Sequence, residues 1–261
     1  MLFETMNELL TLIREKKPLV LNITNHVTMD FVANGLLSMG ASPIMSLAEE
    51  ELEDLIAISH VVVINPGTLN PAFMKLSLQA ADIANRLNKP LILDPVGVGA
   101  SHYRTDMNMQ LLRNHPVSII RGNASEILAL SGEMGGTKGV DSAADSHAVI
   151  ENAKTVSHTF SACVLVSGKI DVVVEKNEVS LSERGSTLMP KITGCGCLLT
   201  AVVGAFHAVE KNRFKAASAA ALFYGVCGEV ATLRAAGPGS FKTAFLDTLH
   251  DVPEKTWYEK N

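Results

Sequence analysis

The sequence predicts an α/β protein with a central, mostly parallel sheet and helices on both faces. Short aliphatic runs alternate with longer segments whose apolar residues recur at helical spacing, which is typical of parallel strands joined by crossover helices. Of the 261 residues, 47% are hydrophobic but only 5% are aromatic, a composition that favours close packing of helices on a sheet. The sequence contains no evident linker or internal repeat, so residues 1–261 are interpreted as one domain.

The expected elements follow one another in regular order. Residues 3–16 carry Leu9, Leu10 and Ile13 at helical spacing and predict an opening helix. Strands are expected at residues 18–24, 41–45, 60–65, 90–94, 117–121 and 162–167. Helices are expected at residues 30–39, 49–58, 71–88, around 111–112, 123–130 and 141–157, with a Gly-rich loop at 132–140. The chain is completed by a small antiparallel edge hairpin at 171–175 and 179–182 and by helices at 198–209, 214–234 and 239–249.

The bulk composition excludes several classes of function. The formal net charge is −5 and no basic run occurs, which gives no support for nucleic-acid binding. Glu4 and Glu8 stand where a secretory signal would carry basic residues. The two most apolar stretches are broken by His207 and by Tyr224 and Glu229, and neither reaches the roughly 20 apolar residues of a spanning helix. The four cysteines are expected to be reduced thiols, so we expect a soluble cytoplasmic protein without nucleic-acid or membrane partners.

Residues 192–200, Ile-Thr-Gly-Cys-Gly-Cys-Leu-Leu-Thr, combine two glycines with the start of an apolar helix. The pattern predicts a tight turn whose backbone N–H groups and helix dipole form an anion site, and phosphate is the usual anion. We expect Gly194, Cys195, Gly196 and Cys197 to form the catalytic turn that holds a transferring phosphoryl group. Cys197 is placed so that its side chain can point back toward the ligand.

Polar residues collect at the predicted carboxyl ends of the strands, where ligands bind in open α/β sheets. Asp94 follows an apolar strand, and its carboxylate can either hold a magnesium ion or cap the next turn. Asn123 and Glu126 have the spacing of a capping box, although Glu126 could also organise magnesium-bound water. Arg121 offers a fork of donors suited to phosphate oxygens. These groups and a helix N-terminus supply the charge neutralisation that phosphoryl transfer needs.

Familiar nucleotide and metal motifs do not account for the chain. The sequence has no G-x-x-x-x-G-K-[ST] segment, and Leu199 takes the place of the third glycine of a dinucleotide fingerprint. Cys195 and Cys197 would point apart on a helix, so they predict neither a metal site nor a redox dithiol.

Six segments, in order along nearly the whole chain, resemble the hydroxyethylthiazole kinase family of ribokinase-like kinases. They are residues 22–27 (Asn-Ile-Thr-Asn-His-Val), 33–35 (Ala-Asn-Gly), 40–45 (Gly-Ala-Ser-Pro-Ile-Met), 94–99 (Asp-Pro-Val-Gly-Val-Gly), 121–126 (Arg-Gly-Asn-Ala-Ser-Glu) and 193–197 (Thr-Gly-Cys-Gly-Cys). The resemblance implies a ribokinase-like fold and a magnesium-dependent kinase. The expected reaction is transfer of phosphate from ATP to the primary alcohol of 4-methyl-5-(2-hydroxyethyl)thiazole, in thiamine salvage.

The resemblance also implies roles for individual residues and an assembly. The implied contacts are thiazole at Asn25, Met45 and Gly194, ATP at Arg121 and Ser167, and Mg²⁺ at Asp94 and Glu126. Family members form homotrimers with sites between neighbouring subunits, so a homotrimer is expected here.

Cys197 departs from the wider ribokinase-like pattern, Gly-x-Gly-Asp, in which the Asp acts as base toward the substrate hydroxyl. Cys195 also replaces the small or hydroxyl residue that is more usual between the glycines. A thiol with an unperturbed pKa of about 8.5 is a poor base at neutral pH unless the helix N-terminus lowers that pKa. Either Cys197 acts as a partial thiolate, or a loose transition state requires no strong base.

Three other functions remain open from the sequence. The first is another ribokinase-like kinase, acting on a pyrimidine or on pyridoxal. The second is an ATP- or ADP-dependent hydrate dehydratase on the same fold. The third is a module that binds thiazole or nucleotide without turnover, although the combination of Asp94, Glu126 and Arg121 argues against it.

Overall fold

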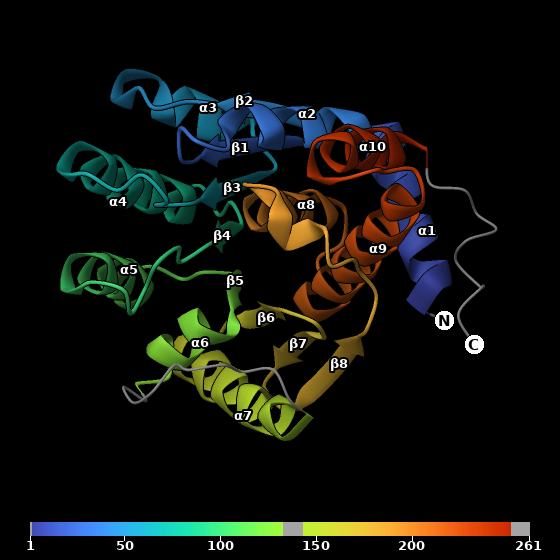
Figure 1. Cartoon of the computed structure of the whole chain (residues 1–261). Coiled ribbons are helices and arrows are strands. Elements are labelled where there is room, and N and C mark those ends of the chain that lie inside the picture. The colour runs from blue at the N-terminus through green and yellow to red at the C-terminus, as the bar shows by residue number, and fades with distance from the viewer. Residues whose placement is uncertain (1, 133–142, 252–261) are drawn as a thin grey trace.

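An eight-stranded sheet with the order β2-β1-β3-β4-β5-β6-β7-β8 forms the centre of the computed structural model (Figure 1), which describes residues 2–132 and 143–251. Neighbouring strands run parallel from β2 to β6, whereas β7 pairs antiparallel with β6 and β8 pairs antiparallel with β7. The strands are β1 (Leu19–Ile23), β2 (Ser42–Met45), β3 (Val61–Ile64), β4 (Leu91–Leu93), β5 (Ile119–Asn123), β6 (Cys163–Ser167), β7 (Asp171–Glu175) and β8 (Glu178–Ser182). The predicted parallel sheet with an antiparallel edge hairpin is therefore confirmed.

Helices cover both faces of this sheet (Figure 1). One face carries α1 (Leu2–Lys16), α2 (Met29–Met39), α8 (Cys195–Val209), α9 (Arg213–Leu233) and α10 (Pro238–His250). The other face carries α3 (Leu52–Ile58), α4 (Pro71–Arg86), α5 (His102–Asn114), α6 (Ala124–Leu130) and α7 (Ala143–Phe160). Each layer has its own apolar core, because alternate side chains of every buried strand point to opposite faces. The two cores fix the sheet rigidly between them.

The structure also corrects some expected boundaries. The helix expected at 49–58 is divided into a 3₁₀ turn, η1 (Glu49–Glu51), and α3. The helix expected around 111–112 is a full helix, α5, with Ser101 as its N-cap. The Gly-rich loop and the beginning of the helix predicted at 141–157 lie mostly outside the described residues.

Helix α9 is long and apolar enough to cross a membrane by length and composition alone. However, 83% of its most apolar window is buried inside the protein, where it packs against α8, α10 and α1. This burial is that of a core helix.

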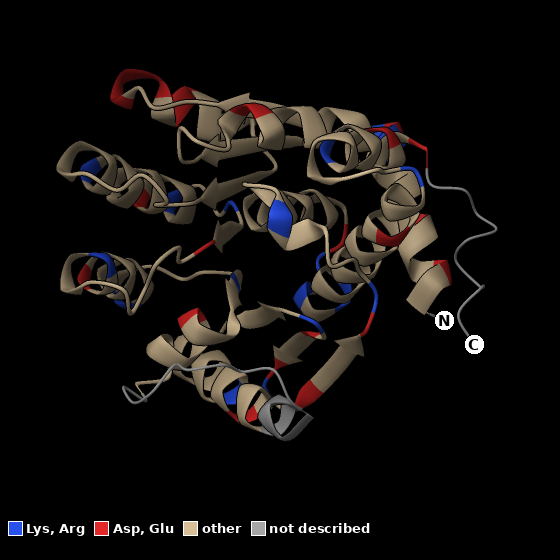
Figure 2. Ribbon diagram, viewed as in Figure 1, with Lys and Arg blue, Asp and Glu red and all other residues tan. Residues whose placement is uncertain are grey.

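The strand register brings the predicted site residues together at the carboxyl ends of the central strands. Ile23 is aligned with Ile64, Ile64 with Leu93, and Leu93 with Ile120. Consequently the segments that follow β1, β3 and β4 leave the sheet side by side, next to the end of β5. Figure 2 shows residues of both charge signs where these central strands end.

Candidate active site

The predicted tight turn is present at the start of α8. Gly194 is the N-cap with φ of 92°, and the first bond of the helical ladder runs from the Leu198 amide to the Gly194 carbonyl at 2.8 Å. The N–H groups of residues 195–197 therefore precede the ladder and are free of intrahelical partners. A Cβ at Gly194 would lie 2.9 Å from Thr28 Cγ2, so both the backbone angle and the close packing on α2 require glycine here.

Arg121 lies directly against this turn. A Cβ at Gly196 would come within 2.6 Å of Arg121 Nη1, so the glycine leaves room for the guanidinium. The guanidinium donates to Ser167 Oγ and lies 3.6 Å from Asp94 Oδ2. Although burial opposes its charge, the carboxylates of Asp94 and Glu126 raise the pKa of Arg121 above its ordinary value. A permanently charged donor thus stands beside the free N–H groups of α8.

Asp94 is almost completely buried, and its two carboxylate oxygens differ. Oδ2 accepts hydrogen bonds from Asn65 Nδ2 at 2.9 Å and from Thr200 Oγ1 at 2.8 Å. Oδ1 is buried without a hydrogen-bond partner among the described residues. Burial raises the pKa of Asp94 to about 6, Arg121 opposes this rise and Glu126 adds to it. One oxygen is held by two hydrogen bonds, and the other has no hydrogen-bond partner among the described residues.

Glu126 has the capping role that its spacing predicts. Its Oε2 accepts from the Asn123 amide at 2.8 Å, while Asn123 Oδ1 accepts from the Glu126 amide at 2.9 Å. The other oxygen, Oε1, accepts from the Gly97 amide at 3.0 Å. The carboxylate is thereby fixed between the loop after β4 and the end of β5, close enough to Asp94 to raise the pKa of its carboxyl.

Asn25 and Cys197 form the other side of the site. Asn25 Nδ2 is 2.9 Å from Asn65 Oδ1 and 3.5 Å from Cys197 Sγ. Because Asn65 also donates to Asp94, a continuous chain of hydrogen bonds links the thiol side of the site to the carboxylate side. Burial, reinforced by the charge of Asp94, raises the pKa of Cys197. Of the two states considered from the sequence, the protonated thiol is therefore favoured at neutral pH.

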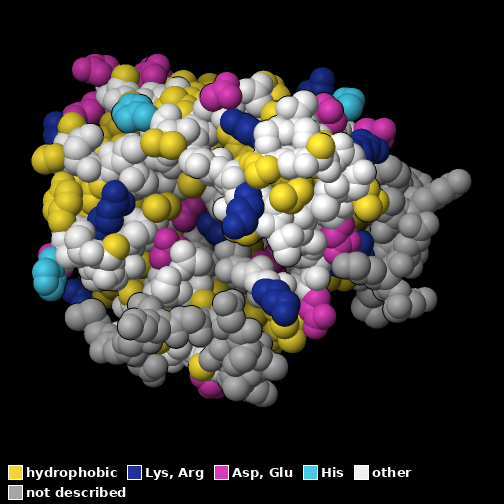
Figure 3. Space-filling view, viewed as in Figure 1, with side chains coloured by type: hydrophobic (Ala, Val, Ile, Leu, Met, Phe, Trp, Pro, Cys, Tyr) yellow, Lys and Arg dark blue, Asp and Glu magenta, His cyan; other side chains and the backbone are white. Residues whose placement is uncertain are grey.

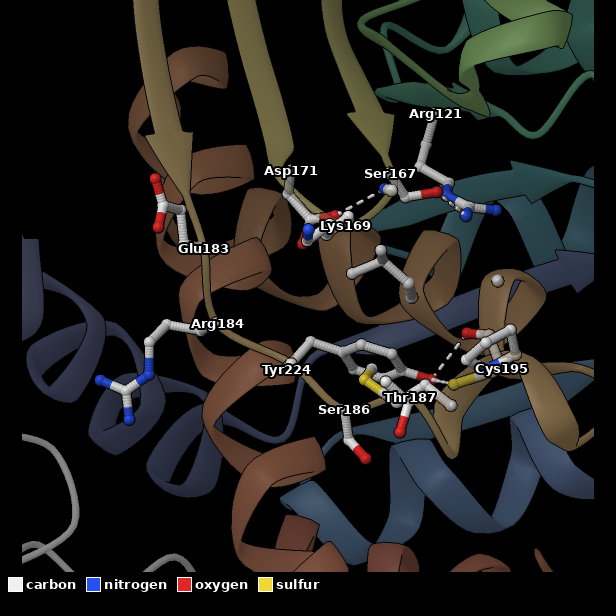
Figure 4. Close-up of a pocket in the computed structure, with 16 residues that line it drawn as sticks. Arg121, Ser167, Lys169, Asp171, Glu183, Arg184, Ser186, Thr187, Cys195 and Tyr224 are labelled. Atoms are coloured by element: carbon white, nitrogen blue, oxygen red, sulfur yellow. Dashed lines mark hydrogen bonds between the residues drawn. The ribbon is translucent and has the colours of Figure 1, made fainter. Parts of the chain in front are cut away.

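A pocket of about 650 Å³ opens beside the turn. Figure 3 shows a hollow in the face of the molecule that carries acidic and basic side chains. In Figure 4 Arg121 and Ser167 lie at one side of the pocket and Glu183 and Arg184 at another, with Tyr224 between them. Tyr224 of α9 lines the pocket and donates a hydrogen bond to the Cys195 carbonyl at 2.7 Å, so it connects the pocket lining with the turn at 194–197.

The structure brings together most of the residues proposed from the sequence. Asn25, Asp94, Arg121, Glu126, Ser167 and residues 194–197 are linked by the contacts given above. Met45 lies in the same row of strand ends, opposite Asn22 in the register, and is half-buried. Sequence reasoning missed the contacts of Thr200 and Tyr224. Both residues lie within apolar helical runs, and the apolar pattern does not reveal that their hydroxyl groups bond to Asp94 and to the Cys195 carbonyl.

Known proteins resemble this chain over nearly its full length. The profile of the Hydroxyethylthiazole kinase family matches residues 10–255. The chain belongs to the hydroxyethylthiazole kinase family. A hydroxyethylthiazole kinase of Leptospira biflexa serovar Patoc is 44% identical over 251 residues, covering 96% of this chain and 94% of the relative.

Solved structures agree with this membership. The structure of a hydroxyethylthiazole kinase protein from Pyrococcus horikoshii OT3 superposes with a TM-score of 0.90 at 37% identity, covering 97% of this chain and 95% of the other. A Bacillus subtilis pyridoxal kinase in an ADP complex superposes with a TM-score of 0.60 at 18% identity, covering 79% and 90%. The second likeness concerns the fold alone, which is that of ribokinase-like kinases. For a hydroxyethylthiazole kinase family member, the turn at 194–197 and the carboxylates beside it form the candidate phosphoryl-transfer site.

Proposed function

We propose that the protein transfers the terminal phosphoryl group of ATP to the primary alcohol of 4-methyl-5-(2-hydroxyethyl)thiazole, in thiamine salvage or biosynthesis. Membership of the hydroxyethylthiazole kinase family supports this reaction. One structural observation carries it further. The start of α8, with its free N–H groups, and the Arg121 guanidinium line a pocket large enough for a small-molecule substrate, and the Asp94 carboxylate lies 3.6 Å from that guanidinium.

The arrangement divides into a phosphate side and an acceptor side. The N-terminus of α8 and Arg121 offer positive charge to an anion in transit, and Ser167 Oγ accepts a hydrogen bond from the guanidinium. We assign ATP contact to Arg121 and Ser167. On the acceptor side we assign the thiazole alcohol to Asn25, Met45 and Gly194. The hydrogen-bond chain through Asn65 keeps the two sides in fixed relation.

Asp94 and Glu126 fit a bound Mg²⁺. Two buried carboxylates and one arginine leave a net negative charge, which opposes the binding of a polyphosphate unless a cation is present. Asp94 Oδ1 has no hydrogen-bond partner in the part of the chain that the structure describes, and carboxylate oxygens are preferred ligands of this ion together with waters and phosphate oxygens. When bound, the ion would neutralise charge on the transferring group.

The acceptor alcohol needs no strong base from the protein in this proposal, because its proton can pass to an oxygen of the transferred phosphoryl group as the new O–P bond forms and the bond to the leaving ADP breaks. Burial keeps Cys197 as a thiol whose sulfur accepts a hydrogen bond from Asn25, so its main contribution is to line the acceptor position. A loose transition state places little charge demand on the attacking oxygen, and alignment with charge neutralisation supplies the rate.

The expected assembly and location are also part of this proposal. We propose a homotrimer with sites between neighbouring subunits, acting in the cytoplasm. Sedimentation of the purified protein measures the first directly, and a monomer at micromolar concentration would contradict it.

The reaction is tested by incubating the protein with ATP, Mg²⁺ and the thiazole alcohol and following the products by mass. An added phosphoryl group on the thiazole supports the proposal. Pyrimidine and pyridoxal alcohols assayed in parallel test the other kinase activities, and loss of water from a hydrate would indicate a dehydratase. Binding of thiazole and ATP without formation of product would indicate a binding module without turnover and would refute the proposed reaction.

A further inference from the structure

Arg104 connects two loops that carry the site, although its own side chain lies outside the pocket. It belongs to α5, and its guanidinium makes three hydrogen bonds to main-chain carbonyls. Nη1 donates to Pro66 O at 2.9 Å and to Val96 O at 3.1 Å, and Nη2 donates to Gly67 O at 2.9 Å. One rigid fork therefore joins the loop after β3 to the loop after β4.

The loop after β3 leads to the acceptor side of the site. Asn65, the residue before the first clamped carbonyl, bonds both Asn25 and Asp94. Gly67 packs so tightly on Asn25 that a Cβ on the glycine would lie 2.9 Å from Asn25 Cγ. A shift of this loop would displace the side chain to which we assign the thiazole alcohol.

The loop after β4 leads to the phosphate side. It begins at Asp94, and its Gly97 amide donates to Glu126 Oε1 at 3.0 Å. Gly97 has φ of 77°, and a Cβ there would lie 2.8 Å from Arg104 Cδ. The loop is thus shaped around the arginine side chain, and the same loop holds both proposed magnesium ligands in place.

We propose that Arg104 is a positioning residue that keeps the acceptor side and the phosphate side of the site in register. This inference rests on the proposed kinase reaction. A fork that bridges both loops fixes the distance between the alcohol and the phosphoryl group, and misplacement by about 1 Å can reduce a rate about 100-fold. Lysine cannot reproduce it, because an ammonium is a single point of donors rather than a planar fork.

The test compares Arg104→Ala and Arg104→Lys with Arg86→Ala, a matched change on α4 where, among the described residues, the arginine pairs with the exposed Glu53. We expect kcat to fall about 100-fold in R104A and about tenfold in R104K, with R86A unchanged. Binding of a nonreactive ATP analogue should keep a stoichiometry of one per chain in all three variants. Millimolar guanidinium, well below denaturing concentrations, should restore part of the R104A rate by replacing the missing donors.

The outcomes separate this inference from the proposed function. Absence of thiazole phosphate with the unmodified protein refutes the reaction itself. Product at the native rate in both R104A and R104K refutes the role of Arg104 and leaves the reaction standing. If R104A fails to fold, R104K decides, since it retains the aliphatic stem. A fall in kcat accounted for by a lower stoichiometry of analogue binding, without guanidinium rescue, would show a purely structural role and overturn the proposal.

Discussion

At the residue scale, Asp94 is the group on which the site depends. Its Oδ2 is held by Asn65 and Thr200, whereas its Oδ1 is buried without a hydrogen-bond partner among the described residues. The two neutral donors orient the carboxylate, and Arg121, 3.6 Å from Oδ2, supplies the opposite charge. The free oxygen is then directed by groups that are themselves fixed to a strand end and to the second turn of α8. Outer partners of this kind commonly control the affinity of a ligating carboxylate for its ion.

Replacing Thr200 by Val tests this orientation. The change keeps the branched shape but removes the donor 2.8 Å from Asp94 Oδ2, so the carboxylate can rotate. We expect activity at limiting Mg²⁺ to fall about tenfold, with smaller losses at saturating Mg²⁺. Thr200→Ser keeps the hydroxyl and serves as the control. Equal Mg²⁺ titration curves for T200V, T200S and the unmodified protein would contradict the expectation.

Cys197 gives a second test at this scale. A general base contributes about 100-fold or more to a rate, so a base role predicts a large loss in Cys197→Ala. Because burial raises the pKa of the thiol, we expect C197A to stay within about tenfold of the native kcat. C197D restores a carboxylate and is expected to match or exceed C197A, most clearly at higher pH where the added acid is ionised beside Asp94. Rates of C197D well below those of C197A would argue against this account.

At the scale of elements, the start of α8 shows what the sequence could predict and what it could not. The glycine spacing at 194 and 196 predicts the turn, and polar residues after apolar runs predict the row of strand ends. The partners within the row were not predictable, because Asn65 reaches Asp94 across neighbouring strands and Thr200 reaches it from a helix. Such contacts depend on strand order and helix rotation. The requirement for glycine at 196 likewise becomes visible only when Arg121 is seen beside it.

Gly196→Ala tests whether the N-terminus of α8 binds phosphate, because the change narrows the turn without removing the helix. The added Cβ would lie 2.6 Å from Arg121 Nη1, so the buried guanidinium must shift away from the turn. We expect kcat/KM for ATP to fall about 10- to 100-fold while α8 itself stays folded, since alanine favours helices over glycine. Gly194→Val should also lose activity, but its φ of 92° and the contact with Thr28 would strain the turn itself. Native ATP kinetics in G196A would refute the placement of phosphate at this turn.

At the scale of the whole molecule, the site places several buried charged groups at the carboxyl ends of the strands, between two apolar layers that cover the sheet. Asp94, Arg121, Glu126 and Asp171 are all at most 9% exposed. Burial raises the pKa of Asp94 and of Asp171 to about 6, so the folded protein keeps these two carboxylates charged at neutral pH at a cost in stability. We infer that part of the folding free energy is lost in forming the site, and that this loss depends on pH.

Asp171 allows that cost to be measured, because it lies in the pocket wall apart from the proposed magnesium ligands. Burial raises its pKa to about 6, while the Gly168 amide, 3.0 Å from Oδ1, and Arg121 oppose the rise. With a folded pKa above the unfolded value of about 3.9, the folded state binds more protons between about pH 4 and pH 6. The stability contributed by this group therefore falls as pH rises through that window and is constant above it.

Asp171→Asn keeps an acceptor for Gly168 but does not ionise, so its free energy of unfolding relative to the native protein should increase from pH 4 to pH 7, by at most about 3 kcal/mol. Urea unfolding of both proteins across this range provides the measurement, with the solvent-exposed Asp82→Asn as the control. A difference that is independent of pH would show that Asp171 ionises normally in the folded protein.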